Sequence, residues 1–327
     1  MIVLTGDIGA TNARLAVVEV VQGRARVVHQ ESSDSKNAPA LAALVQRFLA
    51  AHTGPRPERA CFGVAGPVDS GRVNLTNLGW TLDEASLGRE VGIPVRLIND
   101  FVAIGYAIPV LAGSNLAELQ HGAAPERAPI AIIGAGSGLG HAFLLWEGDR
   151  YVVHSSEAGH GDFAARTPLE AELLASLQAE HGHVSWERIV SGPGLVALYR
   201  FLAARGVPRE QPGLRAEMER GDAAAVITKH ALARSDPLCG EALDRFVDAY
   251  GDQAGNFALS VLARSVYVAG GIAPRILPKL LEGGFARAFR SKGRFEDFLT
   301  QMPIRVIMRP DVGLVGAAVV ALSSTVP

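Results

Sequence analysis

Short β-branched runs alternate with segments of helical periodicity along this chain, and that alternation predicts an α/β protein. Apolar positions spaced i, i+3, i+4 and i+7 predict an amphipathic helix over residues 41–49. Thr167, Pro168 and Glu170 supply the N-cap, N1 and N3 signals of a helix that runs to about residue 181 and ends at Gly182. The strands that we expect lie at residues 2–5, 14–20, 61–65, 95–98, 130–133, 265–269 and 304–307.

The C-terminal half has mostly helical patterning. Helices are expected at 194–204, 223–234 and 238–263, and a last helix from Gly313 is expected to pack back on the first domain. A loop over residues 111–128 separates the first block of elements from the strand at 130. A chain of 327 residues suits two domains rather than one small core.

Composition excludes several classes of function. The 48% of hydrophobic residues excludes wholesale disorder, and 31 basic against 33 acidic residues leave no basic excess for nucleic acid or an acidic membrane. The longest near-apolar run, residues 313–322, is about half of what a membrane span needs. The N-terminus has no signal-peptide pattern, and two cysteines cannot build a disulfide framework or a multi-thiolate zinc site. We therefore expect a soluble cytoplasmic enzyme.

Three glycine-rich turns, at residues 6–12, 134–140 and 270–271, each follow a predicted strand. Glycine lets backbone N–H groups approach a phosphate without an intervening Cβ atom. Each turn alone is also compatible with an ordinary strand connection, and none has the Lys-Ser or Lys-Thr of a P-loop. Asp7, inside the first turn, is placed to hold Mg²⁺ through water, and the set of three turns favours a nucleotide.

Four acidic or imidazole side chains are candidates for chemistry on a polyol. Asp100 follows the strand at 95–98, where it is either a general base or a plain helix N-cap. Glu157 and His160 lie in one glycine-containing turn, and their types suit hydroxyl groups, although a solvated loop is the alternative. A zinc ion is the rival to a polyol at this turn, but Glu157 and His160 would give it only two ligands. Glu187, taken alone, is also compatible with a surface charge.

These pieces together resemble the bacterial glucokinases of the hexokinase family. The resemblance extends over nearly the whole chain, and the matching segments are residues 6–14, 65–68, 74–80, 97–101, 134–140, 156–161, 190–194 and 268–272. It implies an actin-like ATPase (ribonuclease H-like) fold of two domains with an interdomain cleft. The small α/β domain would comprise residues 1–108 and 311–327, and the large α+β domain residues 109–310.

The resemblance also implies roles for individual residues. Asp100 would be the catalytic base, and the glucose hydroxyls would be held by Asn99, Asp100, Glu157, His160 and Glu187. The first phosphate loop would consist of Gly6, Asp7, Ile8, Gly9, Ala10 and Thr11. The second would contain Gly134, Gly136, Ser137 and Gly138, and Gly270 and Gly271 would lie near the adenosine. ATP and Mg²⁺ are the implied cofactors, and a homodimer is the implied assembly.

The expected reaction is therefore phosphoryl transfer from ATP to the 6-hydroxyl of D-glucose, which feeds glycolysis. Ala10 stands where the family usually has a second glycine. The related repressor–ORF–kinase group is disfavoured, because residues 161–166 contain none of its zinc-binding cysteines and no DNA-binding domain precedes Gly6. A kinase for another hexose or an amino sugar remains an alternative. So does a sugar sensor without turnover, although Asp100 and the three turns argue against it.

Overall fold

The computed structural model describes residues 1–9, 11–21, 24–206 and 208–323 of the chain. The chain forms two compact units. The first comprises Met1–Asn115, Leu144–Ser155 and Arg309–Pro327, and the second comprises Leu116–Phe143 and Ser156–Met308. The domain limits expected from the sequence stay a prediction.

The first unit contains a five-stranded sheet with the order β3-β2-β1-β4-β7. Strands β1, β4 and β7 are parallel, whereas β2 and β3 continue the sheet in antiparallel fashion. The strands are β1 (Ile2–Ile8), β2 (Asn12–Val21), β3 (Arg24–Asp34), β4 (Arg59–Val64), β7 (Val95–Asn99) and the separate hairpin of β5 (Arg72–Leu75) and β6 (Trp80–Asp83). The helices are α1 (Leu41–Ala51), α2 (Glu84–Val91), α3 (Asp100–Ala107), α12 (Val312–Leu322) and the 3₁₀ turns η1 (Ile108–Val110) and η2 (Gly113–Asn115).

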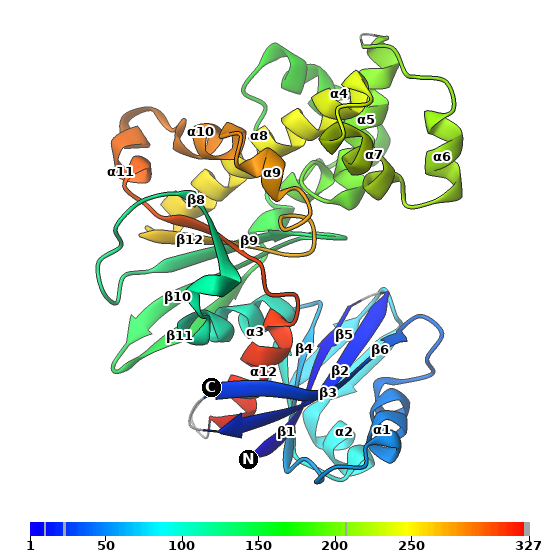
Figure 1. The fold of residues 1–327 in the computed structure, drawn as a ribbon, viewed down its shortest axis with the longest axis vertical. Helices are drawn as coiled ribbons and strands as arrows, with labels where there is room; N and C mark the ends of the chain where they lie inside the picture. The colour runs from blue at the N-terminus through cyan, green and yellow to red at the C-terminus, as the bar shows by residue number, and fades with distance from the viewer. Residues whose placement is uncertain (10, 22–23, 207, 324–327) are drawn as a thin grey trace. The chain divides into compact units, whose positions relative to one another are not determined.

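Helices cover both faces of this sheet (Figure 1). Successive side chains of a strand point to opposite faces, so Leu15 and Val17 of β2 pack in the core that contains α1 and α2. Ala16 and Val18 pack instead in the core that contains α12. Burial on both faces explains the continuous apolar run in β2. The last helix therefore packs on the first unit, as expected.

A six-stranded sheet has the order β11-β10-β9-β12-β13-β8. Its strands are β8 (Leu116–Gln120), β9 (Ile130–Ala135), β10 (Leu139–Glu147), β11 (Arg150–Ser156), β12 (Ser265–Ala269) and β13 (Ile304–Ile307). Strands β9, β12 and β13 are parallel to one another, and β8 is antiparallel to β13. The two sheets share an arrangement of strands. The strand β1 or β9 has the next two strands of the chain on one side, β2 and β3 or β10 and β11, and two parallel strands on the other, β4 and β7 or β12 and β13.

The helices of the second unit pack on β9 and β12, with α8 nearest to both strands (Figure 1). They are α4 (Pro168–His181), α5 (Gly192–Arg205), α6 (Leu214–Arg220), α7 (Ala223–Leu232), α8 (Pro237–Ser260), α9 (Leu277–Leu280), α10 (Gly284–Arg290) and α11 (Glu296–Thr300). Short 3₁₀ turns are η3 (Ala158–His160), η4 (Trp186–Arg188) and η5 (Gly293–Phe295). Thr167 and Glu170 form the predicted capping box at the start of α4.

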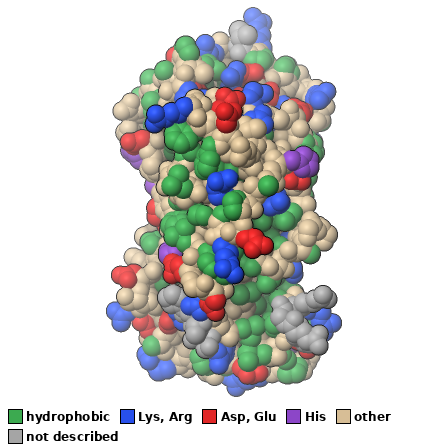
Figure 2. Space-filling view, turned by 90° about the vertical axis from the view of Figure 1, so that its left-hand side faces the viewer, with side chains coloured by type: hydrophobic (Ala, Val, Ile, Leu, Met, Phe, Trp, Pro, Cys, Tyr) green, Lys and Arg blue, Asp and Glu red, His purple; other side chains and the backbone are tan. Residues whose placement is uncertain are grey.

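Two local predictions are wrong. The turn expected over residues 6–12 begins later, because β1 continues through Gly6 and Asp7 to Ile8. The expected loop over 111–128 contains η2 and β8, and β8 pairs with the edge strand β13. Strands β3, β10 and β11 were not expected from the pattern. On the face drawn in Figure 2, basic and acidic side chains are interspersed, in keeping with their near-equal numbers. No helix of the described ranges is both long and apolar enough to cross a membrane.

Candidate active site

Gly6 is part of the central strand β1 and not of a turn. A Cβ atom built there would come within 2.5 Å of Phe62 Cδ1 and 3.0 Å of Leu15 Cδ2, so the two neighbouring strands leave room only for glycine. The turn itself is confined to the residues after Ile8, and it is closed by a hydrogen bond from Gly9 N–H to the Asn12 carbonyl of 3.0 Å. Thr11 is exposed in this turn. Ala10 lies outside the described residues.

Asp7 is held by an arginine that the sequence reasoning did not single out. Asp7 and Arg14 are partners in the β1–β2 register, and the guanidinium of Arg14 forms an ion pair with the Asp7 carboxylate. The same guanidinium donates to the Pro310 carbonyl at 2.8 Å, just before α12. Residues directly opposite each other on neighbouring strands place their side chains on the same face of the sheet. The register of the two strands is therefore the signal that would have predicted this ion pair.

The position of Asp7 fits a magnesium ion held chiefly by phosphates and water. Mg²⁺ usually takes one or two protein carboxylates and keeps several waters. Asp7 supplies one carboxylate, and the described part of the chain has no group of three His, Cys, Asp or Glu side chains that could hold a metal. The donor set therefore suits a metal that arrives with a nucleotide.

Asn99, and not Asp100, caps helix α3. Asn99 Oδ1 accepts the N–H groups of Phe101 at 2.9 Å and Val102 at 3.2 Å, and Asn99 Nδ2 donates to the Gly66 carbonyl at 3.2 Å. Asp100 is the first helical residue, and its Oδ1 accepts the Phe101 N–H at 2.9 Å. A negative side chain is favoured at a helix N-terminus. The N-cap alternative for Asp100 is thus wrong, because its neighbour has that role.

Close backbone packing fixes the start of α3. A Cβ atom at Gly63 of β4 would lie 3.4 Å from the Asp100 Cα and 3.3 Å from the Ala103 Cβ. On the other side, a Cβ at Gly316 of α12 would overlap the Ala103 carbonyl oxygen. Because closely packed backbone segments cannot shift easily, the backbone of Asp100 has a fixed position at the carboxyl end of β7.

Glu187 is bound to the second glycine turn. Its Oε2 accepts the Leu139 N–H at 2.8 Å, and a Cβ atom at Gly138 would overlap that oxygen. Glu187 lies in η4, next to Trp186, which is buried edge-on against Phe163 with a centroid distance of 5.0 Å. The surface-charge alternative for Glu187 is therefore wrong.

Glu157 and His160 lie at the two ends of a single turn, and this turn packs on Leu139 of β10. The His160 N–H donates to the Glu157 carbonyl at 2.9 Å. The Glu157 side chain is 57% exposed and the His160 side chain 61%, with 3.7 Å between Glu157 Oε2 and His160 Nε2. Between them, Gly159 is buried so closely against the Leu139 carbonyl that a Cβ would overlap it. Leu139 thus contacts both the Glu187 carboxylate and the Glu157–His160 turn.

The second and third glycine turns contact each other. Strands β9 and β12 are parallel neighbours, and Gly134 is in register with Ala269. Gly270 has a φ of 81° and approaches the Ala135 carbonyl, which also accepts the Ile272 N–H at 3.2 Å. Left-handed backbone of this kind favours glycine.

Two further glycines in these turns face open space. A Cβ atom at Gly136 or at Gly271 would meet no atom within 4 Å. Gly136 is fixed by its N–H bond to the Gly138 carbonyl and by the Gly192 N–H bond to its own carbonyl, each of 2.8 Å. Ser137, which lies between Gly136 and Gly138, is exposed. A fixed turn with open space over Gly136 can accept a phosphate group.

The structure therefore gathers the candidate residues in two sets. In the first unit, Asp7, Asn99 and Asp100 lie at the carboxyl ends of β1 and β7, with β4 between these strands. In the second unit, the two glycine turns, Glu157, His160 and Glu187 converge on Ala135 and Leu139.

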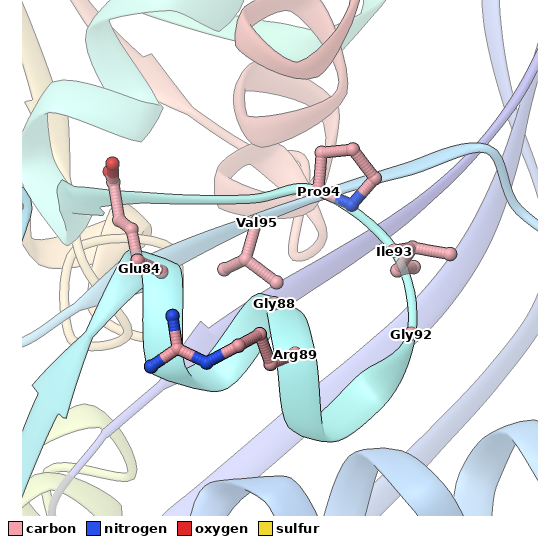
Figure 3. A pocket seen from close by; sticks show the side chains of 8 residues that line it. Glu84, Gly88, Arg89, Gly92, Ile93, Pro94 and Val95 are labelled. Carbon is pink, nitrogen blue, oxygen red and sulfur yellow. The ribbon is translucent and has the colours of Figure 1, made fainter.

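A separate hollow on the first unit contains none of these residues. It has a volume of about 560 Å³ and lies between α2 and the turn leading into β7 (Figure 3). Glu84 and Arg89 project from the helix, and Ile93 and Pro94 come from the turn. The Glu84 carboxylate accepts the Leu97 N–H at 2.7 Å, so it serves local structure.

Comparisons with known proteins show the family of the chain. The sequence model of the glucokinase family matches residues 4–324. A glucokinase from Nostoc punctiforme is 43% identical over 336 residues, with 98% of each chain covered. The structure of a glucokinase from an Antarctic psychrotroph is 33% identical, with a TM-score of 0.82 and 98% of each chain covered. A ROK family glucokinase from Streptomyces griseus, in complex with glucose and AMPPNP, has a TM-score of 0.67 at 21% identity over 98% and 99% of the chains, and shows likeness of fold alone.

The fold and these relatives thus define a sugar kinase of the actin-like ATPase class. Within that class, the chain belongs to the glucokinase family.

Proposed function

We propose that this protein transfers the γ-phosphoryl group of ATP to the 6-hydroxyl of D-glucose, with Asp100 as the base. The family assignment and the relatives named as glucokinases support the reaction. The observation that carries the role of Asp100 is the capping of α3 by Asn99, because the helix then does not depend on Asp100 as its cap. The S. griseus structure with glucose and AMPPNP, an ATP analogue, supports the same two substrates.

The chemical step needs one proton acceptor. The 6-hydroxyl oxygen forms a bond to the γ-phosphorus while the bond from that phosphorus to the β–γ bridging oxygen breaks, and ADP leaves. The hydroxyl proton passes to the Asp100 carboxylate. Such a base contributes about 10² to 10⁴ in rate, and orientation and charge neutralisation supply the rest.

The hydroxyl groups that do not react are held by Asn99, Glu157, His160 and Glu187. Carboxylates accept hydroxyl hydrogen bonds, and the imidazole donates or accepts. The Glu157 and His160 side chains are more than half exposed in the free protein, so both are available to a ligand. Glu187 uses Oε2 for the Leu139 N–H, and its Oε1 is the atom that we assign to the sugar.

The phosphates of ATP are assigned to the backbone of the glycine turns. Gly136, Ser137 and Gly138 would bind them in the second unit, with Gly270 and Gly271 near the adenosine. Gly9 and Thr11 would complete the first loop. Mg²⁺, when bound with ATP, neutralises phosphate charge, and Asp7 is the residue that would hold it through water while Arg14 fixes the carboxylate.

The proposal extends to the setting of the enzyme. We assign it to the cytoplasm, to the entry of glucose into glycolysis and to a homodimer. Size-exclusion chromatography with light scattering tests the last of these, and a mass of one chain of 34.4 kDa would contradict it.

The reaction is tested by ADP release from purified protein with ATP, Mg²⁺ and one sugar at a time. Glucose is expected to give the highest kcat/KM among glucose, mannose, fructose and glucosamine. A higher value for another sugar would replace the acceptor in the proposal. Sugar binding without ADP release would favour the non-catalytic alternative.

A further inference from the structure

Tyr250 and Gln253 of helix α8 are buried polar side chains that the reaction does not use. Tyr250 and Gln253 are 0% and 3% exposed, and they are spaced i, i+3, which places them on neighbouring positions of one helix face. Buried polar groups are costly unless they are hydrogen-bonded. Their partners therefore indicate what these two side chains do.

Tyr250 contacts the ends of the two strands that enter the nucleotide turns. Its Oη accepts the Ala135 N–H at 2.9 Å, and the carbonyl oxygens of Ala269 and Ile133 lie 3.4 and 3.5 Å from it. The Phe285 ring packs edge-on against Tyr250 at a centroid distance of 5.3 Å and fixes its ring. Burial raises the pKa of the hydroxyl, which therefore keeps its proton for a carbonyl.

Ala135 links this bond to the nucleotide turns. Its carbonyl accepts the Ile272 N–H and is in close approach to Gly270. Loss of the Tyr250 hydroxyl would leave the Ala135 N–H buried without that acceptor. The residues displaced first would be those of the second and third glycine turns.

Gln253 contacts the turn that carries Glu157 and His160. Its Nε2 donates to the Ala158 carbonyl at 3.2 Å, and its Oε1 accepts from Asn256 Nδ2 at 3.4 Å, which orients the amide. The neighbouring Asp252 forms ion pairs with Arg166 and Lys292. The segment that follows the turn is thus tied to α8 as well.

We propose that α8 positions the two halves of the candidate site in the second unit separately, the nucleotide turns through Tyr250 and the sugar-binding turn through Gln253. Both are positioning residues, since each acts through backbone groups of other residues. The inference rests on the proposed function for the identity of the two ligands.

The test is steady-state kinetics with ATP and glucose varied in turn for Tyr250→Phe and Gln253→Met. One hydrogen bond in such a position corresponds to a change of about fivefold. Tyr250→Phe is expected to raise the KM for ATP about fivefold and to leave the KM for glucose within twofold. Gln253→Met is expected to raise the KM for glucose about fivefold and to leave the KM for ATP within twofold. Gln253→Asn, whose shorter amide does not reach Ala158, is a second variant if Gln253→Met does not fold.

Matched controls exist in the same unit. Tyr199 is buried and donates to Glu210 at 3.0 Å, and buried Gln120 donates to the carbonyls of Leu299 and Met302 at 2.8 and 2.7 Å. Tyr199→Phe and Gln120→Met should lower the melting temperature with both KM values unchanged. The proposal is overturned if Tyr250→Phe and Gln253→Met behave like these controls, or if each raises both KM values equally. Failure of the proposed function is distinct, because wild-type protein would then release no ADP with glucose.

Discussion

The Glu187 carboxylate accepts the Leu139 N–H at 2.8 Å, and it occupies the place that a side chain at residue 138 would need. A candidate sugar-binding residue is thereby fastened to a candidate phosphate turn. Binding of the two substrates is therefore expected to respond to changes at one glycine.

Gly138→Ala should weaken glucose binding, although residue 138 belongs to the nucleotide turn. The new methyl group would displace Glu187, and loss of a hydrogen bond to a charged group corresponds to about a tenfold rise in the KM for glucose. Gly136→Ala is the matched control, since a Cβ there meets no protein atom within 4 Å and faces only the space assigned to phosphate. It should raise the KM for ATP alone. A normal KM for glucose in Gly138→Ala would contradict the link.

Gly316→Ala should destabilise the first unit. A Cβ at this position overlaps the Ala103 carbonyl, so α12 must move away from α3, at a cost of about 1–3 kcal/mol. Gly313→Ala, on the same helix, places its Cβ 3.8 Å from Asp7 Cγ, which is ordinary contact, and should leave stability unchanged or slightly increased. Urea unfolding measures both, and equal effects of the two variants would refute the close crossing.

The ion pair before α12 should make stability depend on acidic pH. Asp311 accepts two bonds from Arg309, of 2.8 and 3.0 Å, and these hold the pKa of the Asp311 carboxyl below its usual value. A lowered folded-state pKa gives stability that is present above the unfolded value of about 3.9 and is lost as the pH falls through the folded value. Asp311→Asn should therefore be less stable than wild type at pH 7, and the gap should narrow as the pH falls below about 3.9 and close only below the folded-state pKa of Asp311. A constant gap over that range would exclude the ion pair as its cause.

Metal removal should distinguish magnesium from zinc. Treatment with EDTA is expected to abolish turnover and added Mg²⁺ to restore it, because the donor set at Asp7 suits a metal held by phosphates and water. A zinc-selective chelator should leave activity intact once Mg²⁺ is supplied. Stoichiometric zinc whose removal unfolds the protein would contradict the account of the metal.

Much of the fold could be predicted where local signals were strong. The strands at Ser265–Ala269 and Ile304–Ile307 and the capping box of Thr167 rest on contiguous residues, and the structure confirms them. The extension of β1 through Gly6 and Asp7 was missed because both residues disfavour strands, and the neighbouring side chains of Phe62 and Leu15 explain why glycine is needed at residue 6.

The contacts within the site could not be predicted in the same way. The sequence indicated candidate side chains for the chemistry, but Glu187 and Leu139 are 48 residues apart along the chain. The same holds for Tyr250 and Ala135, which are separated by 115 residues. Such pairs are set by how the strands and helices pack, and no periodicity in the sequence encodes them.

The central claim, that Asp100 is the base and Glu187 a sugar ligand, is tested most directly by paired kinetics on Asp100→Asn and Glu187→Gln, with folding checked by circular dichroism. Asparagine keeps the shape of Asp100 but takes no proton, so kcat should fall by about 10² or more with ATP binding intact. Glu187→Gln should mainly raise the KM for glucose. If Asp100→Asn retains more than about a tenth of the wild-type kcat, Asp100 is not the base.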